Sequence, residues 1–208
     1  FHMRVFTPYN KYNPLDCISA ALMEYLFQGG IVKLMSTGRL SFPASLFTEN
    51  NKGKYYDFIG INYYTRSAVH YNFKDDVVPD TKRNDLNWEI YPKGLYTICK
   101  KLYKKYRSPI WITENGTCDN EDSFRSKYII EHLNEIYKLL SDDIPVERYY
   151  HWTLMDNFEW LEGESARFGL IHVDFETQVR TIKNSGEMYA EIAKQKAVTE
   201  DMIRETLN

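Results

Sequence analysis

The chain has 208 residues, of which 43% are hydrophobic and 26% are charged, and this composition is typical of one soluble globular domain. A formal net charge of -3 argues against the basic surface of proteins that bind nucleic acids or anionic membranes, so we expect neither partner.

The cysteines and the N-terminus predict where the protein resides. Cys17, Cys99 and Cys118 are odd in number and lack metal-ligand spacing, so we expect reduced thiols in a cytoplasmic protein, without a disulfide or a zinc site. No apolar run approaches the roughly 18 residues of a membrane span. Because the chain opens at Phe1 and not at Met, we expect a fragment of a longer protein.

The first part of the chain predicts strand, helix and strand in that order. Phe1 to Pro8 fits the tail of a strand. From Pro14 to Gly38 apolar residues recur every three or four positions, which predicts a helix with a break at Gly29-Gly30. A polar loop at Phe42 to Lys54 then leads to a strand at Asp57 to Tyr64. The apolar positions of the helix are Leu15, Ile18, Leu22, Tyr25, Leu26, Ile31, Leu34 and Met35.

The strand at Asp57 to Tyr64 carries polar groups at its carboxyl end. Asn62 and Tyr64 either cap the following loop or belong to a binding site. The segment from Thr65 to Tyr91 lacks helical periodicity and is too long for a plain connection, which is typical of loops that shape a binding mouth. Trp88 lies on this loop.

Two amphipathic helices follow. The first opens at Pro92, with Lys100, Lys101, Lys104 and Lys105 in solvent, and its inward positions are Leu95, Ile98, Leu102 and Tyr106. The second follows a polar capping segment at Asp119 to Ser123, and its buried positions are Ile129, Leu133, Ile136 and Leu140. The remaining predicted elements are a strand at Arg148 to Met155, a hairpin within Phe168 to Ile182, and helices at Ser185 to Lys196 and Thr199 to Leu207.

Between these two helices, residues Pro109 to Gly116 read Pro-Ile-Trp-Ile-Thr-Glu-Asn-Gly. The apolar run predicts a strand buried on both faces, as when helices cover a parallel sheet. It should stop at Asn115-Gly116, because these residue types accept the positive φ of tight turns. Glu114 would then lie at the carboxyl end of its strand, where α/β proteins bind ligands. The alternative is a turn residue that bonds local amides.

Three motifs in order carry a family resemblance: Tyr56 to Arg66, Ile112 to Gly116 and His151 to Gly169. Together they resemble glycoside hydrolase family 1, the retaining β-glycosidases on a (β/α)8 TIM barrel, from about Pro14 to Ile192. The alternation of strands and helices agrees with parallel strands and an α/β fold. Because a barrel needs eight strands and this chain offers about half, we expect residues 1–208 to form the C-terminal half of one barrel domain.

The resemblance implies a catalytic pair. A retaining glycosidase uses two carboxyl groups about 5 to 5.5 Å apart. By resemblance Glu114 is the nucleophile, and Tyr64 donates a hydrogen bond that keeps it ionised and aimed. The acid/base Glu lies in an Asn-Glu-Pro motif in the family, and its nearest imitations here, Asn120-Glu121 and Asn134-Glu135, lack the Pro. We therefore expect the acid upstream of Phe1, with the N-terminal half of the barrel as partner.

The resemblance also implies a sugar-binding set: Asn62, Trp88, Trp152, Glu159, Trp160 and Phe168. Trp152 would lie against the C–H face of a pyranose and Trp88 would be the platform for the leaving group. Glu159 would bind the 4- and 6-hydroxyls, Trp160 the 3-hydroxyl, and Phe168 would wall the 6-position. The alternative is an aromatic core with solvated acids, which the flanking Phe158 and Trp160 make less suitable for Glu159.

Relatives that hydrolyse 6-phosphoglycosides resemble one another in carrying Ser, Lys and Tyr where this chain has Glu159, Ala166 and Phe168. We therefore expect a β-glucosidase-like enzyme for unphosphorylated glycosides, without a metal or organic cofactor. Arg167 is the one charge that could oppose this, although its position points away from the pocket in the family pattern. Two alternatives stay open: a carbohydrate-binding pseudoenzyme, and an inactive fragment that pairs with a separate N-terminal half.

Overall fold

The computed structural model describes residues 1–47 and 52–207, so part of the loop expected at 42–54, including Asn50 and Asn51, lies outside the described residues. The strands are β1 (His2–Pro8), β2 (Ile59–Val69), β3 (Asp75–Asp76), β4 (Ile110–Asn115), β5 (Val146–His151), β6 (Ile171–Val173) and β7 (Arg180–Ile182). The helices are α1 (Pro14–Met23), the π-helical η1 (Glu24–Gly29), α2 (Gly30–Thr37), α3 (Lys93–Tyr106), α4 (Arg125–Ser141), α5 (Asn184–Gln195) and α6 (Glu200–Leu207). Two 3-10 turns are η2 (Ala44–Leu46) and η3 (Trp160–Glu162).

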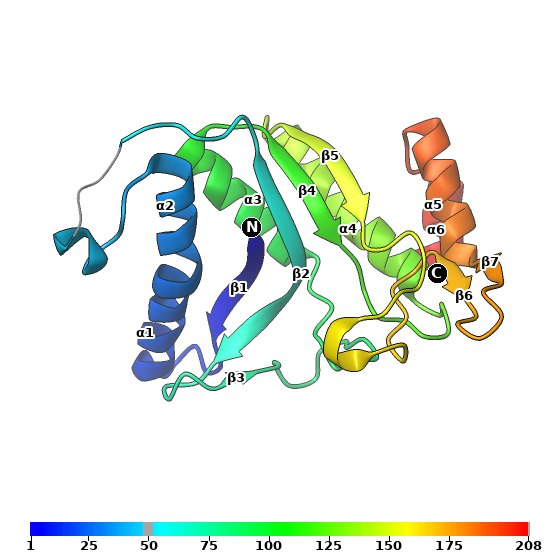
Figure 1. Cartoon of the computed structure of the whole chain (residues 1–208), viewed down its shortest axis with the longest axis horizontal. Coiled ribbons are helices and arrows are strands. Elements are labelled where there is room, and N and C mark those ends of the chain that lie inside the picture. The colour runs from blue at the N-terminus through cyan, green and yellow to red at the C-terminus, as the bar shows by residue number, and fades with distance from the viewer. Residues whose placement is uncertain (48–51, 208) are drawn as a thin grey trace.

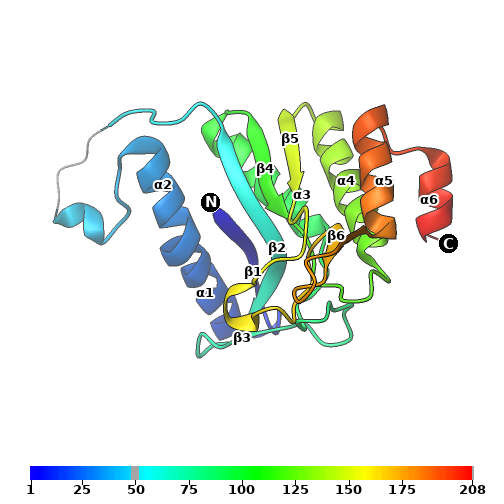
Figure 2. The same ribbon diagram turned by 45° about the vertical axis from the view of Figure 1, so that its right-hand side comes forward.

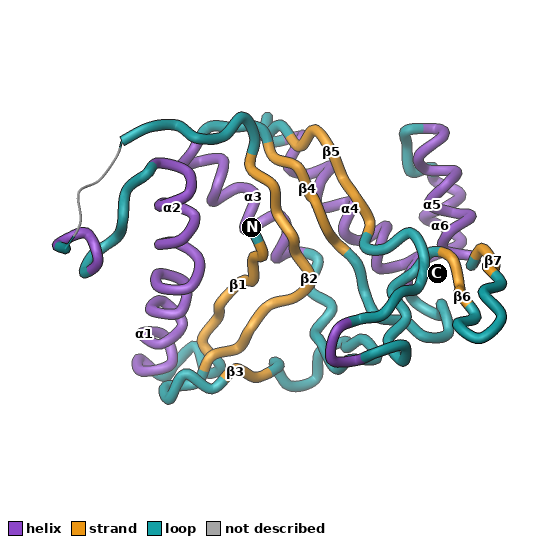
Figure 3. The backbone as a smooth tube through the Cα atoms, viewed as in Figure 1, coloured by secondary structure: helices purple, strands orange, loops and turns teal. Residues whose placement is uncertain are grey.

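A parallel sheet in the order β1-β2-β4-β5 forms the centre of the fold. Its strands run in one direction, so their carboxyl ends meet along one edge, toward the bottom of Figure 1. Helices α3 and α4 lie behind the sheet, α1 and α2 flank one side and α5 and α6 the other (Figures 1 and 2). Strand and helix alternate along the tube in Figure 3, and the arrangement is the predicted second half of a (β/α)8 barrel.

The sheet is packed by helices on one face. Ile110 and Ile112 are fully buried in the core beneath α3, whereas Trp111 points to the other face and is only half-buried. There its ring stacks on Phe58, with ring centroids 3.8 Å apart. The prediction of a strand buried on both faces is therefore wrong for the described residues, because α3 and α4 cover one face and the other is the inner face of the half-barrel.

The long helix at 14–37 departs from its prediction. The backbone continues through Gly29 and Gly30, as the π-helical η1 followed by α2, and the helix ends at Gly38 with φ 67°. The expected break is thus a local widening of the helix. Most of its large apolar residues lie outward, and those exposed are Leu15, Ile18, Leu22, Tyr25, Leu26, Phe27, Ile31, Leu34 and Met35. We call these nine residues the outer stripe.

The same helix corrects the expectation that no segment has the length and apolarity of a membrane span. Residues Pro14–Thr37 span 24 residues with a mean hydropathy of 1.2, which is enough by length and composition alone. Its buried residues, however, include Asp16 and Gln28, which hydrogen-bond to the chain on the sheet side. A helix with one polar, packed face and one apolar, open face is typical of a barrel helix that lacks its neighbour.

Two other boundaries differ from the predictions. Strand β2 continues past Tyr64 to Val69, because β1 pairs with it as far as Pro8. In α4 the buried face includes Leu139, while Leu140 is 49% exposed. The predicted Ile129 and Ile136 are buried and Leu133 is partly buried, so the prediction is wrong at its last position only. The expected strand at 148–155 ends at His151, and the hairpin and the two last helices form as predicted.

Candidate active site

Glu114 and Tyr64 meet at the carboxyl ends of β4 and β2. The Tyr64 hydroxyl donates a hydrogen bond to Glu114 Oε2 at 2.7 Å. Burial, followed by the bond to the Glu114 carboxylate, raises the pKa of Tyr64 well above its ordinary value. The phenol therefore stays protonated and donates to the carboxyl group of Glu114, and such a hydrogen bond favours the charged form that a carboxylate nucleophile needs.

The strand ends at Asn115 as predicted, but for a different reason. Neither Asn115 nor Gly116 has a positive φ among the described residues. The Asn115 amide is fully buried, donates to Tyr63 O (2.8 Å) and Tyr128 Oη (2.9 Å), and accepts from the Tyr149 hydroxyl (2.9 Å). Asn115 thus ties three elements together directly behind Glu114, and Gly116 is needed where the backbone leaves no room for a side chain.

A cavity of about 300 Å³ opens in front of Glu114. Tyr64, Trp88 and Phe168 form one wall, with ring centroids 6.0 to 6.4 Å apart in each pair. Phe168 is 2% exposed, and Trp152 packs against the same cluster. The structure therefore brings seven of the eight predicted residues to one place. The lining residues are His2, Arg4, Tyr64, Thr65, Trp88, Glu114, Trp152, Glu159, Trp160 and Phe168.

Glu159 faces Glu114 across this cavity. The Trp152 indole N–H donates to Glu159 Oε2 at 3.4 Å. Burial raises the pKa of Glu159, the Trp152 bond opposes this, and the charge of Glu114 adds to the increase. The flanking aromatics do not cause the burial, contrary to the expectation, because Phe158 and Trp160 are 69% and 82% exposed. The cavity itself desolvates the carboxyl group.

Asn62 occupies a different position from the other predicted residues. It pairs with Glu114 in the register of β2 and β4, and its Oδ1 accepts a hydrogen bond from the Thr113 hydroxyl at 2.6 Å. It is not among the residues that line the cavity. Its predicted contact with the sugar therefore stays a prediction.

The sequence reasoning missed His2, Arg4 and Thr65, which line the cavity. His2 and Arg4 alternate along β1 with Met3 and Val5, which pack in the core. Because side chains alternate between the two faces of a strand, this pattern in the sequence could have identified both residues as facing away from the core. Burial and then the charge of Arg4 lower the pKa of His2, whose ring stacks on that of Tyr64 with centroids 6.0 Å apart.

Arg4 also corrects the expectation about charge. Arg167 Nη1 donates to Val173 O at 2.9 Å and lies 3.4 Å from Asp156 Oδ2, outside the cavity. The arginine that does line the cavity is Arg4. A cation near the site therefore comes from β1, where Arg4 opposes Tyr64.

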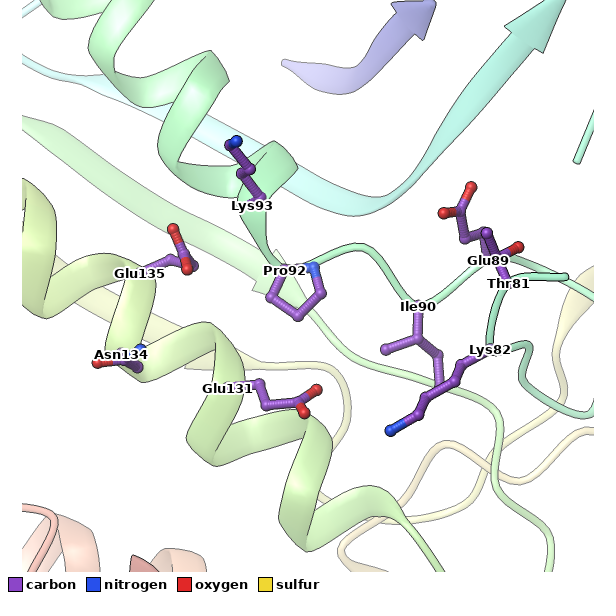
Figure 4. A pocket seen from close by; sticks show the side chains of 9 residues that line it. All are labelled: Thr81, Lys82, Glu89, Ile90, Pro92, Lys93, Glu131, Asn134 and Glu135. Atoms are coloured by element: carbon purple, nitrogen blue, oxygen red, sulfur yellow. The ribbon is translucent and has the colours of Figure 1, made fainter. Parts of the chain in front are cut away.

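The two imitations of the acid/base motif do not face Glu114. Asn134 and Glu135 line a separate cavity of about 420 Å³ between α4 and the segment at 81–93 (Figure 4). There Glu135 Oε1 accepts from Lys138 at 2.6 Å. Glu121 lies exposed in the loop before α4. Within the described ranges, no three His, Cys, Asp or Glu side chains cluster as metal ligands.

Parallel strands with an acid, a half-buried tyrosine and aromatic walls at their carboxyl ends define this chain as the second half of a glycosidase-type (β/α)8 barrel. The model of the family described as glycosyl hydrolase family 1 matches residues 44–198. The chain belongs to this family.

Known relatives agree with the assignment. A β-glucosidase from Agrobacterium sp. is 41% identical over 66% of this chain and 34% of its own length. A β-galactosidase from Saccharolobus solfataricus is 34% identical over 70% of this chain and 33% of its own. The solved β-glycosidase from Pyrococcus horikoshii superposes with a TM-score of 0.88 at 30% identity, over 99% of this chain and 49% of its own.

A solved β-glucosidase from Thermotoga maritima, in complex with glucoimidazole, superposes with a TM-score of 0.83 at 29% identity. It covers 95% of this chain, which covers 50% of it. The chain thus spans about a third of the length of the curated relatives and half of the solved ones.

Proposed function

We propose that this chain, together with the N-terminal half of the barrel, hydrolyses terminal β-D-glycosidic bonds in the manner of a β-glucosidase, with retention. The observation that carries the proposal is the 2.7 Å hydrogen bond from Tyr64 to Glu114 inside an aromatic-walled cavity. β-Glucosidases and β-galactosidases among the relatives support the substrate class.

In this mechanism Glu114 attacks the anomeric carbon while a second carboxylic acid protonates the departing glycosidic oxygen. The C–O bond to the leaving group breaks as the Glu114 ester forms, and water activated by the same second carboxyl group then cleaves the ester. Tyr64 holds Glu114 in its ionised, attacking form. Glu159 and Trp152 bind the sugar, with Trp88, Trp160 and Phe168 around it and Asn62 beside the nucleophile. No step requires a metal or an organic cofactor.

The acid/base group belongs to the other half of the barrel in this proposal. Glu159 is the other carboxyl group that lines the cavity, and the resemblance assigns it to the sugar hydroxyls. We infer one half-barrel domain over residues 1–208 that needs its complement. The three free cysteines fit a cytoplasmic location.

Two open surfaces support a complementary half. The outer stripe on α1, η1 and α2 exposes nine large side chains. On the other side of the fold, a largely apolar cavity of about 580 Å³ lies between α5 and the β6–β7 hairpin, and Leu154 and Ile182 in its lining are 61% and 60% exposed. Apolar surface of this extent marks an interface. It also favours the second candidate, an inactive chain whose role is assembly with a separate N-terminal half.

The first experiment compares the chain alone with the chain plus the N-terminal half. The chain alone should turn over an aryl β-glucoside negligibly, and the added half should restore turnover. Glu114→Gln should then lower kcat by several orders of magnitude. Robust turnover by the chain alone that is unchanged by Glu114→Gln would contradict both the nucleophile and the need for a partner. Binding of glucose-like inhibitors without turnover by the assembled barrel would favour a carbohydrate-binding pseudoenzyme.

The second experiment identifies the nucleophile directly. A 2-fluoro β-glucoside with a good leaving group should form a stable ester, because fluorine destabilises the oxocarbenium-like transition states. Peptide mapping of the assembled protein should find the label between Ile110 and Lys127. A label on Glu159, or no label on an active enzyme, would overturn the assignment.

A further inference from the structure

Arg4 stands apart from the other residues around the cavity. It is the only Lys or Arg among the described lining residues, and its side chain is 35% exposed. It lies on β1, whereas Glu159 follows β5, and Glu114 on β4 is between them in the strand order. Arg4 opposes Tyr64, the hydrogen-bond partner of Glu114, so it lies at the Glu114 end of the cavity.

Two backbone irregularities meet at Arg4. Between Met3 and Val5 the register with β2 shifts by one residue, so that Tyr64 and Thr65 together oppose Arg4. On the other side, the buried Gln28 of the π-helical segment accepts from the Arg4 amide N–H and donates to Arg4 O at 2.8 Å. Bulges and π-helical turns are enriched at functional sites because they re-aim side chains. Here they fix the position of Arg4 beside Tyr64.

The guanidinium keeps unused donors. Nη1 donates to Ser67 Oγ (3.3 Å) and to Asp75 Oδ2 (3.1 Å), and the Ser67 hydroxyl holds the same carboxylate oxygen at 3.1 Å. Within 1–47 and 52–207, no side-chain hydrogen bond uses Nε or Nη2 of Arg4. An arginine anchored at one nitrogen is well placed to offer the others to an acceptor.

We propose that Arg4 binds the leaving group of the substrate and selects leaving groups that carry acceptor oxygens, either hydroxyls of a second sugar or a carboxylate. The inference rests on the proposed function for the position of the first sugar. Carbon 4 and carbon 1 are opposite corners of a pyranose, so a sugar held by Glu159 at carbon 4 and by Glu114 at carbon 1 directs its leaving group away from Glu159. Arg4 lies at that end of the cavity, beside Tyr64 and Glu114. Gln28 is a positioning residue for Arg4.

The test measures binding, so that it does not depend on turnover. The ligands are three thio-linked β-glucosides that are not hydrolysed, with phenyl, 4-carboxyphenyl and glucosyl as the leaving groups. Calorimetry on the assembled barrel should show that Arg4→Met lowers the affinity for the glucosyl or the carboxyphenyl ligand about tenfold or more, as expected for the loss of a charged hydrogen bond. The affinity for the phenyl ligand should fall less than about twofold. If the affinity falls more for the carboxyphenyl ligand, Arg4 selects anionic leaving groups. If it falls more for the glucosyl ligand, Arg4 selects a second sugar.

Variants of neighbouring and remote residues separate contact from structure. Arg4→Lys should recover part of the preference, and Gln28→Ala should reduce it without removing the charge. Arg148→Met is the matched control, because Arg148 lies over Trp111, 4.6 Å from the ring centroid, and outside the cavity. Equal losses for all three ligands, or no loss, would overturn the role of Arg4. Absence of turnover of the O-linked glucosides by the wild-type barrel would instead count against the proposed function.

Discussion

Gly116 and Trp152 touch through their backbones where β4 and β5 end. A Cβ atom on Gly116 would lie 1.8 Å from Trp152 O, so no side chain fits there. The contact joins the strand that carries Glu114 to the segment that carries Trp152 and Glu159. The nucleophile and the sugar-binding group therefore share one rigid junction.

The first prediction tests this junction. Gly116→Ala should destabilise the fold by about 1–3 kcal/mol or more, because backbone must move to admit a methyl group. Urea unfolding followed by tryptophan fluorescence measures the change. Gly38→Asn is the matched control, since Gly38 caps the C-terminus of α2 in the left-handed conformation (φ 67°, ψ 16°), which Asn tolerates. An Ala variant as stable as the wild type would show that the junction is not rigid.

The second prediction concerns the hydrogen bond to the nucleophile. Tyr64→Phe in the assembled barrel should lower kcat/KM for an aryl β-glucoside by about 10- to 100-fold, which corresponds to the loss of a hydrogen bond to a charged group. Tyr63→Phe is the control: its hydroxyl donates to Tyr91 O at 2.6 Å, away from Glu114. That variant should lose stability with little change in the rate. Equal rate losses for both would argue that Tyr64 acts through folding.

Sequence patterns predicted best where one packed face sets the pattern. The apolar periodicity of α3 correctly predicted that Leu95, Ile98 and Leu102 are buried, because one face of this helix packs on the sheet. In α4 the same reasoning predicted that Leu140 is buried, whereas the structure buries Leu139. The fully buried Arg125 also lies on the packed face of this helix, and a charged residue cannot be recognised from a pattern of apolar residues. Its guanidinium bonds to carbonyl groups of distant loops, which only the fold brings together.

The site was predicted where motifs carry it and missed where geometry does. Glu114, Tyr64 and Glu159 converge as the resemblance implied. Arg4 was not predicted because it belongs to no motif. Its position depends on the shifted register between β1 and β2 and on the hydrogen bonds to Gln28, and both join residues 24 or more positions apart in the sequence. Asn115 was taken for a turn residue because its type permits one, whereas tertiary hydrogen bonds use its amide fully.

The third prediction concerns acid sensitivity. Burial lowers the pKa of His132 to about 4, and burial with the charges of Arg125 and His132 lowers that of His151 to about 3. Both are neutral in the folded state, whereas the unfolded chain takes up protons near pH 6.5. Their contribution to stability is therefore full above about pH 6.5 and decreases as the pH falls toward 4, by roughly 1.4 kcal/mol per pH unit for each histidine.

Urea unfolding between pH 4.5 and 7.5 measures this slope. His151→Phe should roughly halve it, because both ring nitrogens of His151 lack a hydrogen-bond partner among the described residues and no proton is then gained there on unfolding. His172→Phe is a suitable control, since His172 is 48% exposed in its side chain. A pH-independent midpoint for the wild type over this range would contradict the buried, neutral histidines.

The last prediction concerns phosphorylated sugars. A sugar 6-phosphate carries nearly two negative charges, and Glu159 with the buried Ala166 and Phe168 provides a carboxylate and no cation where the resemblance locates the 6-position. Repulsion in a partly desolvated site amounts to a few kcal/mol, so kcat/KM for an aryl β-glucoside should exceed that for its 6-phosphate by about 100-fold or more. We do not expect Arg4 to offset this, because it opposes Tyr64 at the Glu114 end of the cavity. The double variant Glu159→Ser with Ala166→Lys should narrow or reverse the ratio, whereas Glu162→Ser, which removes an acid next to the cavity but not in its lining, should leave it unchanged. A wild-type enzyme that prefers the phosphorylated glycoside would show that a cation reaches the 6-position after all, and Arg4→Met would then reveal whether Arg4 supplies it.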